Sequence, residues 1–81
     1  MPSAWVIEVR ADNTEQQHGL FEFAQLPNTG DRIALETAGQ TLHAFGVLQV
    51  EHYPARIPPG EVPKEPSAAI YISWLHEMAP K

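Results

Sequence analysis

The sequence has no cysteine, only five basic residues against ten acidic ones, and no long apolar run. Without cysteine, disulfides, thiolate metal sites and cysteine nucleophiles are all excluded. The basic residues are scattered, which argues against binding along a phosphate backbone: Arg10, Arg32, Arg56, Lys64 and Lys81. A formal net charge of -5 disfavours anionic membrane surfaces, and no segment approaches the ~20 apolar residues of a membrane-spanning helix.

The composition indicates one small folded domain covering residues 1–81. Hydrophobic residues make up 43% of the 81 positions, which is too many for a disordered tail. A chain of this length buries only about 60% of its unfolded surface, so we expect a thin core. The first five residues lack the basic region and apolar run of a secretory signal, and we therefore expect a cytoplasmic location.

Hydrophobic and polar residues alternate in five segments, which predicts strands over 5–10, 20–26, 32–37, 41–53 and 68–75. Alternation also predicts which side chains are buried: Trp5, Ile7, Val9, Phe21, Phe23, Ile33, Leu35, Ile70, Ile72 and Trp74. Residues 11–19 are polar and predict a loop, whereas residues 76–81 predict a frayed tail.

The residues between and within these segments also predict two turns and a β-bulge. Residues 27–31, Pro-Asn-Thr-Gly-Asp, predict a tight turn, and residues 38–40 predict a hairpin connection. Within 41–53 the apolar parity changes between Val47 and Val50. A bulge between Gly46 and Gln49 would return Phe45, Val47, Val50 and His52 to one face.

Five of the eight prolines lie in residues 54–67. Proline cannot donate to a sheet ladder, so we expect a stiff loop that returns the chain for the last strand. Its single P-x-x-P, from Pro63 to Pro66, is also compatible with docking on an aromatic groove or on a second copy of the chain.

This pattern predicts an all-β fold, a small five-stranded, mostly antiparallel barrel with the proline-rich loop before the last strand. An SH3-like or an OB-like topology fits the strand count. The lack of a helical segment between the third and fourth strands favours the SH3-like one.

Two strings resemble small bacterial β-domains of unknown function. They are Leu-Pro-Asn-Thr-Gly-Asp-Arg-Ile at 26–33 and Phe-Gly-Val-Leu-Gln-Val-Glu-His-Tyr-Pro at 45–54, a cadence of LPxxGDxI followed by FxVxxVxHxP. The similarity covers the central half of the chain and consists of turn and core residues. It therefore implies a fold and no catalytic residue.

The residues that could carry chemistry form no local motif. No two of the four histidines, His18, His43, His52 and His76, lie within four positions of each other. We therefore predict no metal site and no cofactor. Alternation places the strand carboxylates on the solvated face: Glu8, Glu22, Glu36 and Glu51. Neither a Gly-x-Ser-x-Gly setting nor a glycine-rich phosphate loop occurs, so no catalytic residue is predicted.

His52 is the most informative histidine because it lies where a strand meets the proline-rich loop. Our first interpretation is structural, with a ring N–H donated to a loop carbonyl. The functional interpretation places it in a partner-binding surface with Tyr53, Arg56 and Tyr71, since exposed tyrosines are favoured at interfaces.

We accordingly expect a noncatalytic protein-interaction module that self-associates, because a partner can supplement a thin core. One alternative is a small enzyme that uses His52 with a strand carboxylate, which requires a concave pocket holding both groups within hydrogen-bond reach. The other is a nucleic-acid-binding barrel, which requires a contiguous basic face formed by Arg10, Arg32 and Arg56.

Overall fold

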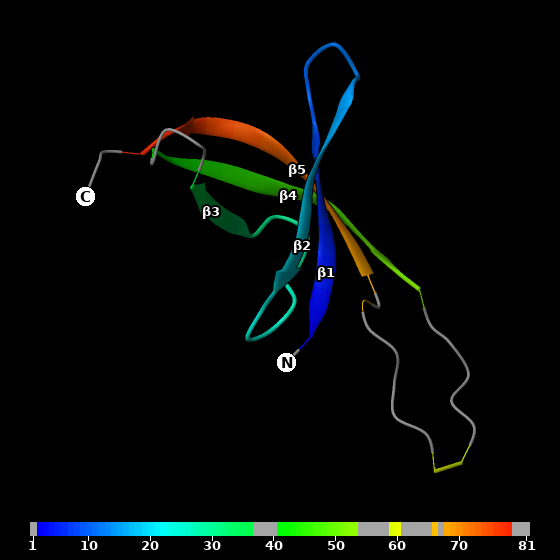
Figure 1. The fold of residues 1–81 in the computed structure, drawn as a ribbon. Coiled ribbons are helices and arrows are strands. Elements are labelled where there is room, and N and C mark those ends of the chain that lie inside the picture. The colour runs from blue at the N-terminus through cyan, green and yellow to red at the C-terminus, as the bar shows by residue number, and fades with distance from the viewer. Residues whose placement is uncertain (1, 37–40, 54–58, 61–65, 67, 79–81) are drawn as a thin grey trace.

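The computed structural model of the chain describes residues 2–36, 41–53, 59–60, 66 and 68–78. These residues form five strands: β1 Ser3–Val9, β2 Glu15–Glu22, β3 Arg32–Glu36, β4 Leu42–His52 and β5 Ala68–Glu77. The strands make one sheet in the order β2-β1-β5-β4-β3, which curls into a half-barrel (Figure 1). Nothing in the described part of the chain is a helix of the length and hydrophobicity that a membrane crossing needs.

The pairing confirms the predicted all-β, mostly antiparallel fold. β1 with β2, β3 with β4, and β4 with β5 are antiparallel, whereas β1 and β5 run parallel. β2 and β3 form the two edges and do not contact each other. The sheet is thus mixed and open between its edges, and the SH3-like topology stays a prediction.

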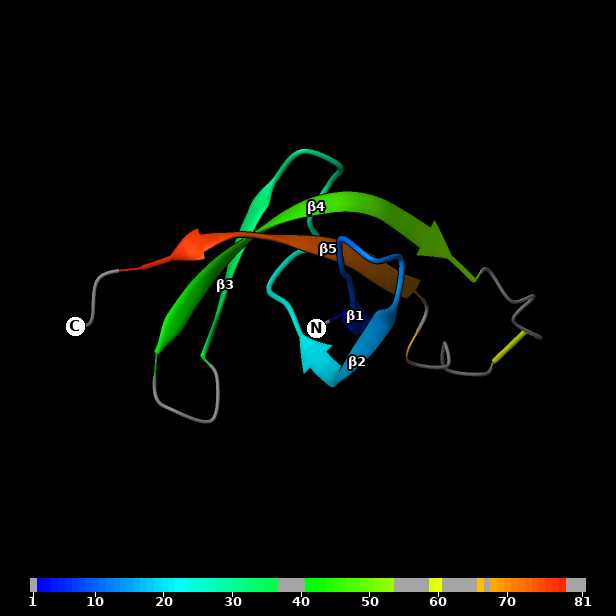
Figure 2. The same cartoon turned by 90° about the horizontal axis from the view of Figure 1, so that it is seen from above.

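The two longest strands, β4 and β5, are bent, and their pairing is irregular at two places (Figure 2). The register shifts between Ala44 and Phe45 and again between Val47 and Gln49. The second shift confirms the bulge predicted within 46–49. Because of it, Val50 packs against the same core as Phe45 and Val47, despite its opposite parity.

The core lies on the concave face and is built from small and medium side chains. Its buried members are Ala4, Val6, Phe45, Val47, Ala68, Ile70 and Ile72. Partly buried apolar residues from the flanking elements pack against them: Phe21, Phe23, Leu26, Ile33, Leu35 and Val50. The inward prediction for Phe21, Phe23, Ile33, Leu35, Ile70 and Ile72 is therefore confirmed.

The predicted burial of β1 was wrong, because its alternation is inverted. Ala4 and Val6 are fully buried, whereas Trp5 is 39% exposed on the opposite face. Side chains converge on the inside of a small curled sheet, so narrow residues fit there and a tryptophan does not. Ala4 pairs directly with Ala68, and Trp5 pairs with Leu20 on the convex face.

The predicted burial of Trp74 was also wrong: the residue is 53% exposed. The pairing of β1 with β5 ends at Glu8 and Ile72. Trp74 therefore lies in the part of β5 that has no β1 strand beside it. The predicted tail at 76–81 was wrong in its first residues as well. β5 continues to Glu77, and the Met78 amide donates to the Leu42 carbonyl over 2.8 Å.

The predicted loop over 11–19 is much shorter, because β2 begins at Glu15. A tight turn joins β1 to β2, with the Arg10 amide donating to the Thr14 carbonyl over 2.9 Å and Asn13 at a φ of 66°. Asp12 Oδ1 accepts the Thr14 hydroxyl at 2.6 Å and the Thr14 amide at 3.1 Å. These hydrogen bonds hold the turn in place. The polar residues that follow it, from Glu15 onward, can therefore pair with β1 and form the start of β2.

The turn at 27–31 is confirmed. The Asp31 amide donates to the Asn28 carbonyl over 3.0 Å, Asn28 donates back to Asp31 Oδ2 over 2.8 Å, and Gly30 has a φ of 94°. Two backbone hydrogen bonds tie this turn to β4: the Gly30 amide donates to the Val47 carbonyl, and the Val47 amide donates to the Asp31 carbonyl, each over 2.9 Å. The connection at 38–40, Arg56, residues 79–81 and most of the proline-rich segment 54–67 lie outside the described residues.

Candidate functional site

The concave face changes from apolar to polar toward the tip of the β1–β2 hairpin. The inward positions of β1 are Ala4, Val6 and Glu8, and Glu8 lies opposite Ile72 of β5. The Glu8 side chain is only 14% exposed. Its predicted place on the solvated face was therefore wrong, for the same reason that the Trp5 prediction was wrong.

His18 meets Glu8 because of the irregularity between β1 and β2. Val6 pairs with Gly19 and Ile7 pairs with Gln17, so His18 is the extra residue in the register. Its Nε2 lies 2.8 Å from Glu8 Oε1, and its ring stands edge-on to Phe45 at 5.8 Å between centroids. Because a carboxylate only accepts, Nε2 carries the shared proton, and Nδ1 remains for another partner.

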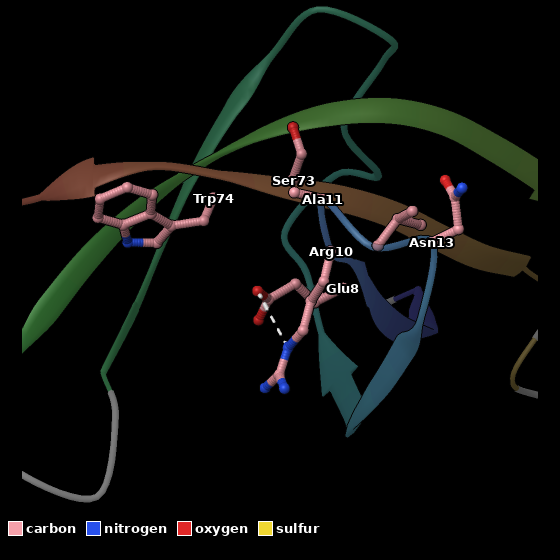
Figure 3. A pocket seen from close by; sticks show the side chains of 7 residues that line it. Glu8, Arg10, Ala11, Asn13, Ser73 and Trp74 are labelled. Carbon is pink, nitrogen blue, oxygen red and sulfur yellow. Dashed lines mark ion pairs between the residues drawn. The ribbon is translucent and has the colours of Figure 1, made fainter.

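Arg10 lies on the outer side of this pair. Its Nε is 3.8 Å from Glu8 Oε2, and its side chain is 52% exposed (Figure 3). The guanidinium therefore lies near the carboxylate, and about half of its side chain remains open to solvent.

A second histidine faces the same space from β4. Trp74 Nε1 donates to His43 Nδ1 over 2.9 Å, and the two rings are 6.4 Å apart. This bond fixes the neutral tautomer of His43, with its proton on Nε2. Phe45 lies beside His43 at 6.5 Å between ring centroids, and forms a buried floor for both histidines.

These side chains line two adjoining hollows, which we call the hairpin groove. One of about 290 Å³ is lined by Glu8, Arg10, Gln16, His18, His43, Phe45 and Trp74. The other, of about 550 Å³, is lined by Glu8, Val9, Arg10, Ala11, Asn13, Ser73 and Trp74 (Figure 3). Glu8, Arg10 and Trp74 belong to both. The groove combines an aromatic wall, a cation and a histidine–carboxylate pair, which is a set suited to proton transfer or to holding a polar ligand.

The described residues contain no group of three histidine or acidic side chains that could hold a metal ion. His43 and His52 lie at opposite ends of β4, where they pair with Glu77 and Ala68. His76 Nδ1 lies 3.1 Å from the carbonyl oxygen of Glu77, so His76 is engaged at the far end of β5.

The partner-binding surface predicted from His52, Tyr53, Arg56 and Tyr71 stays a prediction, and Arg56 lies outside the described residues. The Tyr53 hydroxyl donates to Glu51 Oε1 over 2.5 Å. This hydrogen bond, with smaller contributions from burial and from Tyr71, raises the pKa of Tyr53 to about 12. Tyr53 and Tyr71 are therefore neighbours. His52 is exposed and pairs with Ala68, and its loop-fixing role stays a prediction.

The two described arginines are far apart in the sheet. Arg10 follows β1, whereas Arg32 begins β3 at the sheet edge, and β5 and β4 lie between these strands. The described residues thus give the nucleic-acid alternative no contiguous basic face.

Sequence alternation missed the groove, because His18 fell in a predicted loop and Trp74 in the predicted core. One signal was available. Ala4, Val6, Ala68 and Ile70 form a narrow inward set, and extending its parity along β1 places Glu8 on the same side. The bulge at His18 has no comparable signal in the sequence.

Comparisons with protein-family models, with curated proteins and with solved structures give no match. The resemblance to small bacterial β-domains stays a prediction from the two quoted strings.

Proposed function

We propose that the chain is a noncatalytic, cytoplasmic protein-interaction module that self-associates. The observation that supports this most strongly is the open sheet: β2 and β3 are edges that do not contact each other. A free edge presents unpaired backbone N–H and C=O groups, which another strand can satisfy. A closed barrel would have used these groups internally.

Exposed apolar side chains support the same proposal. Trp5 and Leu20 lie opposite each other on the convex face, and Leu48, Tyr53 and Leu75 are exposed as well. The hydrophobic core is small by comparison, since its three largest fully buried side chains are only Ile70, Ile72 and Val6. Association would bury apolar surface that the single chain leaves in water.

The test is the molar mass as a function of concentration. Light scattering from micromolar to millimolar protein is expected to give a mass that rises from the 9.0 kDa of one chain toward twice that value. A mass that stays at one chain throughout, with an intact β-sheet circular dichroism spectrum, would contradict self-association.

A second proposed function rests on the His18–Glu8 pair. The enzyme alternative predicted from the sequence uses His52 with a strand carboxylate, but His52 does not line the hairpin groove. His18 does, and its Nε2 lies 2.8 Å from Glu8 Oε1, so the second proposal assigns the histidine role to His18. His18 would then act as the base toward a bound water, with Glu8 orienting its ring.

Hydrolysis of p-nitrophenyl acetate, a generic activated ester, can test this second function. His18→Gln is expected to remove most of the histidine-dependent rate, whereas the exposed His52→Gln variant should retain it. Equal losses in the two variants would indicate ordinary imidazole reactivity and would eliminate the acid–base function.

A further inference from the structure

We propose that two copies of the chain associate by pairing their β3 strands antiparallel across a twofold axis at Ala34. This inference rests on the proposed self-association and names its interface. β3 pairs with β4 along one side only, from Arg32 opposite Gly46 to Glu36 opposite Leu42. Its other side is the edge of the sheet.

The side chains of β3 are complementary to themselves when the strand is reversed. The strand reads Arg-Ile-Ala-Leu-Glu, with opposite charges at its two ends. Antiparallel pairing centred on Ala34 places Arg32 opposite Glu36 of the partner subunit, and twofold symmetry repeats that pair. It also places Ile33 opposite Leu35 of the partner subunit. A parallel, in-register pair would instead set arginine against arginine and glutamate against glutamate.

Neither charge is satisfied within one chain by a described residue. Arg32 and Glu36 are exposed, and neither is in an ion pair with any part of the chain that the structure describes. The two residues are four positions apart along an extended strand, about 13 Å at ~3.3 Å per residue, and no ion pair joins these two described residues in one copy. Pairing between copies supplies the missing partner for both.

The faces of β3 suit this arrangement. Ile33 and Leu35 are half-buried and pack against the concave core, so the same residues of a second copy would extend that apolar layer. On the other face, the small exposed Ala34 would meet its own counterpart at the axis without obstruction. The two sheets would become one continuous sheet.

The opposite edge is less suited to such pairing. β2 has a register shift at Val6 and Ile7 of its neighbour, and its Gly19 has a φ of 113°. Bulges interrupt the flat ladder that an incoming strand needs. The β3 register is continuous over all five residues.

The experiment uses charge reversal and sedimentation equilibrium. Arg32→Glu and Glu36→Arg each place like charges at both symmetric positions, and each is expected to raise the dimer dissociation constant at least tenfold. The double variant Arg32→Glu/Glu36→Arg restores opposite charges and is expected to return to within about threefold of the original value. An equimolar mixture of the two single variants is expected to form a heterodimer, because their strands are again complementary.

Controls separate the interface from net charge and from folding. The net charge changes from -5 to -7 in Arg32→Glu and to -3 in Glu36→Arg, so a net-charge effect would move the two variants in opposite directions. Glu22→Arg makes the same charge change as Glu36→Arg at an exposed residue of β2, and should keep the original dissociation constant. Circular dichroism verifies that each variant is folded.

The outcomes distinguish the two proposals. If the chain dimerises but the single variants dimerise equally well and their mixture gives no preferred heterodimer, the β3 interface is wrong and self-association stands. If the original chain remains monomeric at every concentration, both proposals are overturned.

Discussion

The coupling free energy between Glu8 and His18 tests the geometry of the hairpin groove most directly. Their hydrogen bond is 2.8 Å long, and their side chains are only 14% and 18% exposed. Hydrogen bonds to charged groups contribute about 1.5–3 kcal/mol, whereas fully exposed ion pairs contribute about 0–1 kcal/mol. For a mostly buried pair that retains some solvent contact, we expect a coupling of about 1–2 kcal/mol.

A double-mutant cycle measures this quantity, with Glu8→Ala, His18→Ala and the double variant unfolded by urea. Far-ultraviolet circular dichroism is the suitable signal, because Trp74 lines the groove and its fluorescence would respond to local changes. The loss of the Arg10 contact cancels in the cycle, since it occurs whenever Glu8 is replaced.

The matched control pairs His18→Ala with Glu22→Ala, an exposed carboxylate of the same strand as His18. Its coupling should be zero within about 0.5 kcal/mol. A Glu8–His18 coupling no larger than this control would refute the closely bonded pair, and with it the acid–base function.

Three further predictions concern the core, the hairpin turn and the tyrosine surface. Ile70 is fully buried between Val6 and Val50, so Ile70→Ala should lower the free energy of unfolding by about 2–5 kcal/mol and Ile70→Val by about 0.5–1.5 kcal/mol in urea titrations. Asn13 has a φ of 66°, so Asn13→Ala should cost about 1 kcal/mol in the same titrations while Asn13→Gly costs little. Tyr53 should titrate near pH 12 in ultraviolet difference spectra, above its ordinary pKa of 10.0, and replacing its acceptor by Glu51→Gln should move that titration toward 10. Because the folded-state pKa is raised, the contribution to stability is complete below pH 10 and is lost as the pH rises through about 12.

Sequence alternation predicted the buried face correctly in strands that have only one apolar face. In β3, Ile33 and Leu35 alternate with charged or small residues, and the structure places them inward as predicted. The parity break between Val47 and Val50 was sufficient to locate a bulge, because only an extra residue returns both to one core.

β1 shows why the same logic failed elsewhere. Both faces of this strand are apolar, with Ala4 and Val6 on one and Trp5 and Ile7 on the other. Hydrophobicity favours the larger residues for the core, but curvature favours the smaller ones, and curvature is a property of the whole sheet. A choice between two apolar faces therefore depends on information that no single strand contains.

The groove was less predictable than the fold because it depends on pairing between segments distant in the sequence. His43 and Trp74 are 31 positions apart, and they meet because β4 and β5 pair antiparallel. His18 reaches Glu8 through a bulge in a segment whose polar composition predicts a loop. Neither contact leaves a local motif, and so the histidines looked unrelated along the chain.

The irregular pairing of the sheet bears on both the groove and the open edges. A regular register beyond Val6 and Gly19 would pair His18 with Ile7, which lies on the convex face, and would separate it from Glu8. Bulges also bend and twist the strands that contain them, and here the bent sheet ends with β2 and β3 apart. The shift between β1 and β2 thus places His18 beside Glu8 on the concave face, whereas the two shifts between β4 and β5 accompany a bent sheet whose edge strands do not contact each other.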